Sequence, residues 1–313
     1  MASLQDRCIS LIRNFRRRPD TSARSLLVTV FGDSIAPHGG EVWIGSLLRL
    51  LEPLGISERL VRTSLHRLVA EGLLVTRRHG RHSFYSIAPS AHRRFSEAER
   101  RIYHPRVADP WDGRWTVVVE NNGVAPPVRT ALRQQLTSLG FGSLGPPVHV
   151  SPFDRTEELR ALLHDLRLSG QVIVLWGEIP SSLGGSDREL TRAVSGELEA
   201  LEPSWRAFVR RFRPIADAIA QEGGEVDGQS ALVTRTLLVH AYRRLVLREP
   251  QLPAALWPPS WPGEAAYEVA ARCYHAVTAS AEMHLAATCE TSGEPLPPLA
   301  PGYADRYPNP RLT

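Results

Sequence analysis

Residues 55–72 read GISERLVRTSLHRLVAEG, and this stretch predicts a helix that begins at Ser57 and ends before Gly72. Ser57 is a favourable N-cap because its hydroxyl can accept a hydrogen bond from the first turn, and Glu58 places negative charge at the positive end of the helix dipole. Gly72 suits the left-handed residue that commonly follows a helix. Apolar residues recur at helical spacing between these ends, so they share one face of the predicted helix.

The opposite face of this helix is basic. Its polar side chains, with Arg67 at the border, are Arg59, Arg62, Thr63 and His66. Glu71 is the only carboxylate between residues 59 and 87. A basic helix face of this kind is either an ordinary solvated surface or a binding surface for a polyanion such as DNA.

An arginine-rich hairpin is predicted directly after the helix. Residues 73–76 and 83–87 have the composition of short strands, and RRHGRH at residues 77–82 joins them, with Gly80 suited to positive φ. A short apolar helix at residues 47–51 comes before the first turn. The order helix, turn, helix, basic hairpin is typical of a winged helix-turn-helix, in which one helix enters the major groove of DNA. A helical hairpin used for protein contacts is the alternative.

The predicted DNA site therefore has two parts. We expect the helix to meet the major groove through Ser57, Arg59, Arg62, Thr63, His66 and Arg67. We expect the hairpin to contact the DNA backbone or the minor groove through Arg77, Arg78 and Arg81.

The distribution of charge supports a polyanionic partner. Residues 1–106 contain 18 Arg and 9 acidic residues, whereas the rest of the chain contains 19 Arg and 24 acidic residues. The formal net charge of +4 thus conceals a basic first third and an acidic remainder. All 37 basic residues are arginine, so their placement is more informative than their number. Binding of a polyanion by the basic part should weaken with salt because counterions are released.

Several features of catalytic or metal sites are not supported by their context. Cys8, Cys273 and Cys289 are too scattered for a zinc finger or a disulfide framework. The G-x-G-x-x-G string at residues 140–145 follows a predicted helix rather than a strand, so we interpret it as a turn and not as a nucleotide site. Glu120 is a lone carboxylate that we expect to be a solvated strand end. We expect no enzyme activity, no metal and no cofactor.

The segments of the chain predict an α+β multidomain fold. We expect a winged helix-turn-helix domain at residues 22–90 and a linker helix at 91–112. Strands alternate with helices at residues 113–185, which predicts a ferredoxin-like α/β middle domain. An all-α dimerisation and effector domain is expected at 186–290, and a Pro-rich tail at 291–313. Because no secretory signal and no apolar run of membrane-spanning length is apparent, we expect a cytoplasmic protein with no membrane contact.

Individual helices can also be predicted from the sequence. The first domain should begin with a helix at residues 22–35. Arg16-Arg17-Arg18 should be a solvated tail, with a DNA-contacting arm as the alternative. The expected helices of the last domain are those at residues 188–201, 204–220, 230–248 and 264–290.

A candidate effector site lies in the last domain. His240, Arg244 and Arg248 recur every four residues and predict a cationic stripe, with Arg243 beside it and Tyr242 in an apolar face. Two indoles follow on a proline-rich segment. Cations beside aromatic rings suit an anionic aromatic ligand, although the indoles could instead fasten a loop and the arginines could pair with carboxylates or solvent. The candidate effector-binding residues are His240, Tyr242, Arg243, Arg244, Trp257 and Trp261.

Short motifs in all three predicted domains carry a resemblance to a known family. They are Trp43-Ile44-Gly45-Ser46-Leu47, Pro53-Leu54-Gly55, Val61-Arg62-Thr63-Ser64, Arg67-Leu68, Gly80-Arg81, Arg101-Ile102-Tyr103, Trp111-Asp112-Gly113-Arg114-Trp115, Gly140-Phe141-Gly142, His240-Ala241-Tyr242-Arg243-Arg244, Leu252-Pro253 and Trp261-Pro262-Gly263. With them the chain resembles the PaaX family of repressors of phenylacetic-acid catabolism over roughly residues 22–290. It departs from the family at Arg248-Glu249-Pro250, where Glu249 replaces the usual Asp.

The resemblance implies a winged helix-turn-helix head, a middle domain similar to the ferredoxin-like subunits of CRISPR adaptation, and a helical C-terminal domain. It also implies a homodimeric repressor that binds a double-stranded DNA operator and is released by phenylacetyl-CoA or a related aryl-acyl-CoA. One alternative is a metal-dependent nuclease or RNA-processing protein built on the middle domain, with activity that depends on Glu120. A scaffold that oligomerises on DNA without an effector is a third hypothesis.

Overall fold

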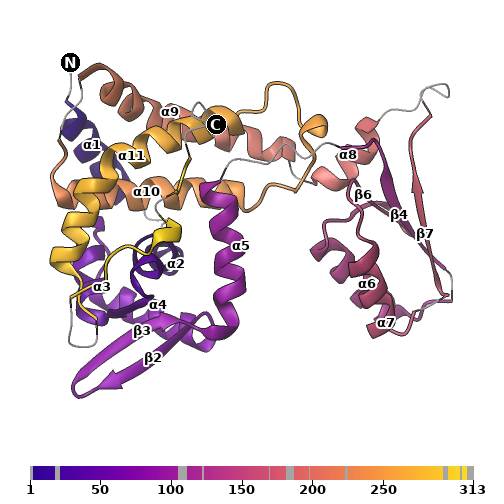
Figure 1. Ribbon diagram of the computed structural model, residues 1–313, viewed down its shortest axis with the longest axis horizontal. Coiled ribbons are helices and arrows are strands. Elements are labelled where there is room, and N and C mark those ends of the chain that lie inside the picture. Colours follow the sequence, from indigo (N-terminus) through magenta and orange to yellow (C-terminus); the bar gives the residue numbers. More distant parts are fainter. Residues whose placement is uncertain are drawn as a thin grey trace. The chain divides into compact units, whose positions relative to one another are not determined.

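The structure is a computed structural model in which the described residues are 3–17, 22–104, 111–121, 123–168, 170–180, 187–196, 198–222, 225–291, 295–303 and 305–308. It is a mixed α and β protein with two small antiparallel sheets (Figure 1). The chain divides into two compact units. Unit 1 comprises Met1–Pro105, Pro203–Leu247 and Pro262–Thr313, and unit 2 comprises Arg106–Glu202 and Arg248–Trp261. None of the helices within the described ranges has the length and apolar character needed to cross a membrane.

The N-terminal segment forms a packed helix that we did not predict, and Arg16 and Arg17 at its end are exposed. Helix α1 spans Leu4–Arg16 and begins with a capping box in which Ser3 and Asp6 exchange hydrogen bonds. Its apolar face is buried and packs against α10 (Gly228–Val246). The signal that could have revealed the helix is the helical spacing of its buried residues Leu4, Cys8, Leu11 and Phe15. Arg18 lies outside the described residues.

The next part of unit 1 contains the predicted helices and hairpin. Its elements in chain order are α2 (Ala23–Val30), β1 (Glu41–Trp43), α3 (Ile44–Leu51), α4 (Glu58–Ala70), β2 (Leu74–His79) and β3 (His82–Ile87). The three strands form an antiparallel sheet in the order β1-β3-β2. Helix α2 is shorter than predicted because the chain widens into a π-type turn at Phe31–Ile35, which buries Asp33 and Ser34. The domain boundaries inferred from the sequence stay a prediction.

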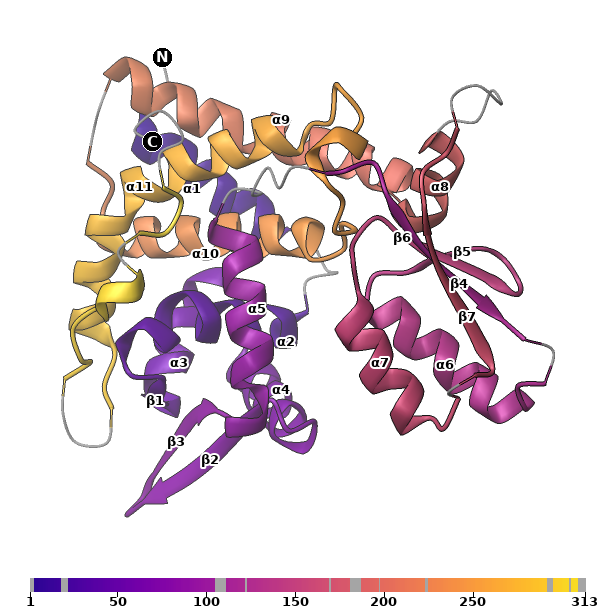
Figure 2. The ribbon, with the colours of Figure 1, turned by 45° about the vertical axis from the view of Figure 1, so that its right-hand side comes forward.

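Four further helices follow, some with bounds that differ from the prediction. Helix α5 (His92–Tyr103) runs from the base of the hairpin toward α10 in both ribbon views (Figures 1 and 2). The predicted helices at 188–201 and 204–220 are wrong in their division, because the structure has α8 (Asp187–Ser195) and α9 (Leu198–Glu222). The break lies at Gly196, which has a φ of 53°, and α9 continues through Pro203. Helix α11 spans Gly263–Thr288.

Unit 2 contains the predicted alternation of strands and helices. Its elements are β4 (Trp115–Glu120), α6 (Pro126–Ser138), β5 (Gly142–Gly145), β6 (Val148–Ser151), α7 (Thr156–Asp165) and β7 (Val172–Gly177). The sheet order is β5-β6-β4-β7, and the succession β-α-β-β-α-β is the ferredoxin-like one. Its core packs Val118 of β4 against Leu132 and Leu136 of α6 and Leu159 of α7. Helix α5 lies within the predicted linker at residues 91–112, and residues 105–110 of that linker lie outside the described residues.

The glycine string at residues 140–145 is more than the turn that we predicted. Gly142–Gly145 forms the edge strand β5, and α8 packs against it. A Cβ added at Gly142 would lie 2.1 Å from the carbonyl oxygen of Ala193. Glycine is therefore required here for a close approach of two backbones.

Candidate nucleic-acid interface

Helix α4 presents its basic face to solvent. The Ser57 hydroxyl accepts a hydrogen bond from the backbone N–H of Leu60 at 3.4 Å and so caps the helix as predicted. Val61 and Leu65 are fully buried on the inner face. On the outer face the exposed side chains are those of Arg59, Arg62, Thr63, His66 and Arg67. The helix is thus fixed by its apolar side and free on its basic side.

Arg62 has an intramolecular partner that we did not predict. Its Nη2 lies 2.6 Å from Oε1 of Glu58, one turn earlier on α4. Both side chains are more than half exposed. An exposed pair of this kind is weak, because solvent screens it and two long side chains must be ordered. Arg62 can therefore exchange Glu58 for a nucleic acid at small cost.

The hairpin of β2 and β3 carries the second group of predicted residues. The two strands pair from Leu74 opposite Ile87 to His79 opposite His82, and Gly80 at the tip has a φ of 59°. The hairpin is anchored along β3, because Phe84 is buried and the ring of His82, near the tip, packs edge-on against Trp43 with centroids 5.0 Å apart. The predicted side chains of Arg77, Arg78 and Arg81 are all exposed along it.

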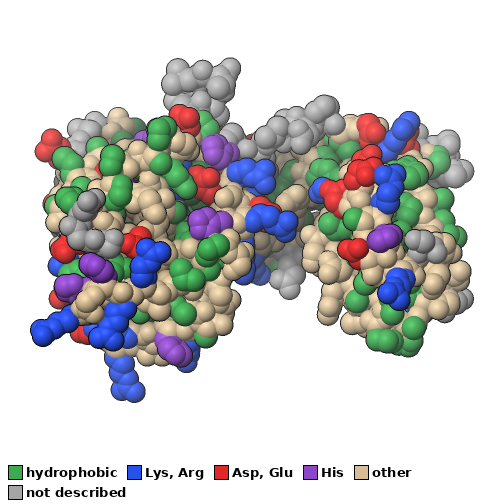
Figure 3. Space-filling view, turned by 60° about the horizontal axis from the view of Figure 1, so that its bottom comes forward, with side chains coloured by type: hydrophobic (Ala, Val, Ile, Leu, Met, Phe, Trp, Pro, Cys, Tyr) green, Lys and Arg blue, Asp and Glu red, His purple; other side chains and the backbone are tan. Residues whose placement is uncertain are grey.

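This end of unit 1 is poor in free negative charge. Arginine side chains, in blue, gather on the unit at the left of Figure 3, where the hairpin end comes forward. Glu71 at the far end of α4 forms an ion pair with Arg24 of α2, and the hydrogen bonds from Arg24 lower the pKa of its carboxyl group. The carboxylate therefore stays ionised and neutralised by Arg24, which leaves the outer face of α4 cationic.

The residues of the predicted cationic stripe on α10 are not all at the surface. The His240 ring is buried, and its Nδ1 lies 3.1 Å from Oγ1 of Thr29. Burial, together with the nearby charge of Arg243, lowers the pKa of His240 to about 3, so the ring is neutral. Tyr242 is buried against Trp205, with ring centroids 5.2 Å apart. Arg244 is exposed.

The stripe was misjudged because α10 has no solvent face along most of its length. Helices α1, α2, α5 and α11 all pack against it. Its residues are buried in an almost continuous run from Ala231 to His240. The spacing of four residues therefore did not identify which side of α10 is exposed. Whether the predicted residues contact an effector stays a prediction.

The two indoles belong to unit 2 and fasten a loop there. The Trp261 indole N–H donates to Glu249 Oε1 at 2.9 Å, and the Trp257 indole N–H donates to the Leu252 carbonyl at 3.0 Å. Their ring centroids lie 5.6 Å apart. This arrangement is the loop-fastening alternative that the sequence left open. The remaining candidate effector residues lie in unit 1.

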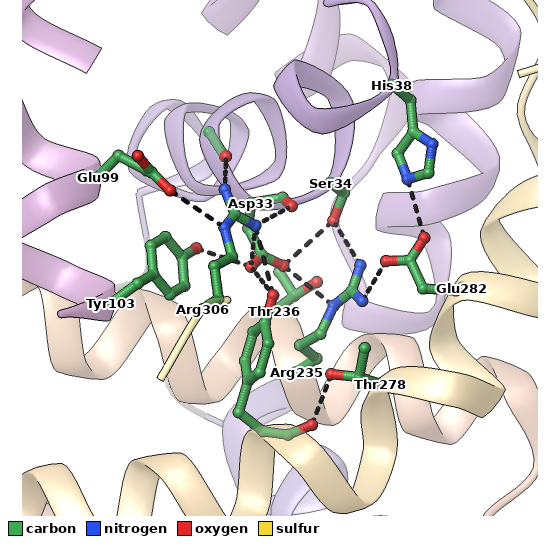
Figure 4. Close-up of polar contacts among 12 residues, drawn as sticks. Asp33, Ser34, His38, Glu99, Tyr103, Arg235, Thr236, Thr278, Glu282 and Arg306 are labelled. Atoms are coloured by element: carbon green, nitrogen blue, oxygen red, sulfur yellow. Dashed lines mark hydrogen bonds and ion pairs between the residues drawn. The ribbon is translucent and has the colours of Figure 1, made fainter. Parts of the chain in front are cut away.

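A buried charged network in unit 1 was not predicted from the sequence (Figure 4). Asp33 accepts a hydrogen bond from the Tyr103 hydroxyl at 2.7 Å. Its carboxylate also lies 3.1 Å from Nε of Arg235, an ion pair without hydrogen-bond alignment, and 3.4 Å from Nη1 of Arg306. Arg235 is fully buried, and Arg306 is 4% exposed. Charged residues within the apolar stretches 26–35 and 231–239 were the signal that could have revealed it.

Glu282 of α11 extends this network. It forms an ion pair with Arg235, and its Oε2 lies 2.8 Å from Nε2 of His38. Nδ1 of His38 lies 2.6 Å from the Pro297 carbonyl, which can only accept a hydrogen bond. Burial opposes ionisation of Glu282, but the hydrogen bond from His38 and the charge of Arg235 outweigh it and lower its pKa to about 2. The π-type turn, α10 and α11 are therefore joined by paired charges.

Glu120 is not the solvated strand end that we predicted. It is 3% exposed, and Oε1 accepts hydrogen bonds from Nε of Arg133 and Nε2 of His149, both at 2.7 Å. Nε of Arg129 lies 3.3 Å from Oε2. Burial opposes ionisation, yet the hydrogen bonds from Arg133 and His149 lower the pKa of this carboxyl group. In the described part of the chain no group of His, Cys, Asp and Glu side chains is arranged to hold a metal ion.

Together these features define an α+β protein of two compact units with an exposed basic helix and hairpin on unit 1. Three family models match successive parts of the chain: "PaaX-like protein" at residues 22–91, "PaaX protein central Cas2-like domain" at 108–191 and "PaaX-like protein C-terminal domain" at 197–287. The chain belongs to the PaaX family. The family that the sequence motifs predicted is thereby confirmed, as is the Cas2-like nature of the middle domain.

One similar protein supports this assignment, and one solved structure has a similar fold. Transcriptional repressor PaaX of Escherichia coli (strain K12) is 35% identical over 289 residues, which cover 91% of this chain and 90% of that protein. The solved structure of uncharacterized protein Rv0674 from Mycobacterium tuberculosis is similar with a TM-score of 0.52 and 23% identity. It covers 84% of this chain, and 98% of its own chain is matched. The second similarity concerns the fold alone.

Proposed function

We propose that this protein is a sequence-specific DNA-binding transcriptional repressor. The observation that carries the proposal is the exposed basic face of α4, which lies beside an arginine-tipped hairpin. The acidic residues at the two ends of this helix are each paired with an arginine, Glu58 with Arg62 and Glu71 with Arg24. On this proposal residues 22–91 form a winged helix-turn-helix, with α4 in the major groove and the hairpin along the backbone or minor groove. The similarity to a transcriptional repressor over most of both chains supports the same function.

We further propose that the repressor is a cytoplasmic homodimer that controls aromatic-acid catabolism. Its operator would lie beside genes for phenylacetate degradation, and an aryl-acyl-CoA, phenylacetyl-CoA or a relative of it, would release the repressor. Motifs shared with the PaaX family along nearly the whole chain support this proposal. The helices after residue 186 would form an all-α dimerisation and effector domain.

We propose a binding protein rather than an enzyme. A nuclease built on the middle domain would need Glu120 as a metal ligand or a base. This carboxylate is instead buried and accepts hydrogen bonds from Arg133 and His149. The nuclease hypothesis is therefore not favoured.

Replacing Arg62 by alanine tests the proposed major-groove contact. If Arg62 pairs with a guanine edge, Arg62→Ala should weaken specific binding by about 1–3 kcal/mol and relax the base preference at one position. The fold should be retained because the side chain is more than half exposed. Fluorescence anisotropy with operator and scrambled duplexes measures both affinities. Arg93→Ala on α5, which also removes an exposed arginine paired with a glutamate one turn away, is the control. Operator affinity equal to that of the wild type would remove Arg62 from the site.

Replacing the hairpin arginines tests the proposed backbone contacts. Arg78→Ala and Arg81→Ala should weaken binding to all duplexes by similar factors, because phosphate contacts carry no sequence information. Each change should reduce the slope of log affinity against log salt by about one. Titrations at several salt concentrations measure this slope. An altered base preference at an unchanged slope would show instead that the hairpin contacts base edges.

A further inference from the structure

Unit 1 contains a cavity of about 400 Å³ beside the hairpin. Residues of α2, α5 and α10 line it, together with Ser86 and Ile87 at the end of β3. Much of its wall is apolar and includes Val28, Phe95, Ile102, Val239 and Leu247. A dry cavity of about 150 Å³ is sufficient for benzene in an engineered protein. This cavity therefore has room for an aromatic ring and a short polar group.

Arg243 lines the cavity and lacks a negative partner. Its Nε donates to Thr29 Oγ1 at 2.7 Å, and its Nη2 donates to the carbonyl and hydroxyl oxygens of Ser25 at 2.7 and 2.8 Å. All these acceptors are uncharged. Among the described residues no carboxylate pairs with Arg243. Its Nη1 atom donates no hydrogen bond to any described residue. Burial lowers the pKa of this guanidinium to about 10.

The acidic side chains that line the same cavity are already neutralised. Asp33 lies against Arg235 and Arg306, and Glu99 lies 3.5 Å from Nε of Arg306. Arg243 is partly buried, and a charge withdrawn from water without an opposite charge is costly. A bound acceptor, which the chain itself does not supply, would therefore stabilise its positive charge. A carboxylate or acyl oxygen has the chemistry to accept hydrogen bonds from Nη1.

We propose that this cavity binds the acyl part of an aryl-acyl ligand, with Arg243 donating hydrogen bonds to its carboxylate or acyl oxygen and the ring packed among Phe95, Ile102 and Val239. This proposal rests on the effector response proposed above and gives that response a location. The site differs from the exposed cationic stripe expected from the sequence, because Arg244 does not line the cavity. The ligand could be a free acid or a thioester, because both offer an oxygen that accepts hydrogen bonds and an aromatic ring.

The position of the cavity connects ligand binding to DNA binding. Its wall includes the end of β3, which continues into the hairpin, and α10 of the helical part of unit 1. A ligand that contacts β3 and α10 stabilises the relative position of these two elements in which both contact the ligand best. It releases DNA only if that arrangement differs from the DNA-bound one, because equal affinity for both would shift nothing.

Isothermal titration calorimetry of the full chain without DNA tests the site. The probes are phenylacetate and phenylacetyl-CoA, and the variants are Arg243→Gln, Ala98→Phe, which fills the cavity from α5, and Arg244→Gln as the matched control. The wild type should bind at least one probe. Arg243→Gln and Ala98→Phe should weaken that binding about tenfold or more, since a charged hydrogen bond or the space for the ring is lost. Arg244→Gln should bind as the wild type does.

The outcomes separate this inference from the proposed function. Binding of phenylacetate identifies the free acid as the source, and binding of the thioester alone identifies the acyl-CoA. No binding of either probe, or wild-type affinity in both cavity variants, would overturn the site, as would a loss confined to Arg244→Gln. Thermal unfolding shows whether Arg243→Gln is folded, and Ala98→Phe keeps all the hydrogen bonds of Arg243. Operator affinity measured separately tests the DNA-binding function whatever the calorimetry shows.

Discussion

Replacement of Asp33 by alanine should destabilise unit 1 by about 3–5 kcal/mol, the cost of removing one partner from a buried ion pair. Asp33 lies within 3.4 Å of Arg235 and Arg306, and both guanidinium groups are almost completely buried. Without its carboxylate these two cations would face one another with less compensation. The Tyr103 hydroxyl would also lose the acceptor that it now has at 2.7 Å.

Urea unfolding of the wild type and Asp33→Ala, followed by circular dichroism, measures the effect. The matched control is Glu97→Ala, which removes an exposed ion pair with Arg93 on α5 and should leave the unfolding midpoint nearly unchanged. A loss below about 1 kcal/mol in Asp33→Ala would contradict the account, because it would mean that the network stabilises no more than a surface pair does.

Replacement of Glu282 by glutamine should destabilise the protein in a pH-dependent way. The pKa of this carboxyl group is about 2, whereas the ordinary value is 4.5. A lowered pKa means that folding favours the ionised form, so the stabilisation is present above pH 4.5 and is lost as the pH falls toward 2. The difference corresponds to about 3 kcal/mol at pH 7 and about 1 kcal/mol at pH 3. Glu282→Gln should lack this contribution.

Urea unfolding of both proteins at several pH values between 3 and 7 measures the gap in stability. We expect it to shrink steadily toward acid, because the wild type loses the charge that the variant never has. Glu97→Gln provides the control, since its partner Arg93 is almost fully exposed. A gap that stays constant from pH 7 to pH 3 would show that glutamine destabilises by shape alone.

The sequence was sufficient for the elements whose signals are local. Helix α4 follows from the cap at Ser57 and from apolar spacing, and the hairpin follows from its strands and Gly80. The strands and helices of unit 2 follow from their alternation. The ion pair between Glu58 and Arg62 could also have been predicted, because residues four apart on a helix lie next to each other.

The buried network depends on contacts between distant parts of the chain. Arg306 donates to the backbone carbonyl of Asp33 across 273 positions, and periodicity carries no information about such partners. Helix α10 shows the same limit, because other helices surround it and its pattern does not distinguish a surface stripe from a buried one. The burial of His240 and the cavity beside Arg243 therefore became visible only in the fold.

The central claim is that the protein binds specific DNA sequences through α4 and the hairpin. Selection from a pool of random double-stranded DNA, with the full chain immobilised and the bound fragments sequenced after each round, tests it most directly. The account predicts that one motif is enriched, and that Arg62→Ala enriches a motif with relaxed preference at one position. Bound sequences indistinguishable from the starting pool, for the folded wild-type protein at moderate salt, would contradict it.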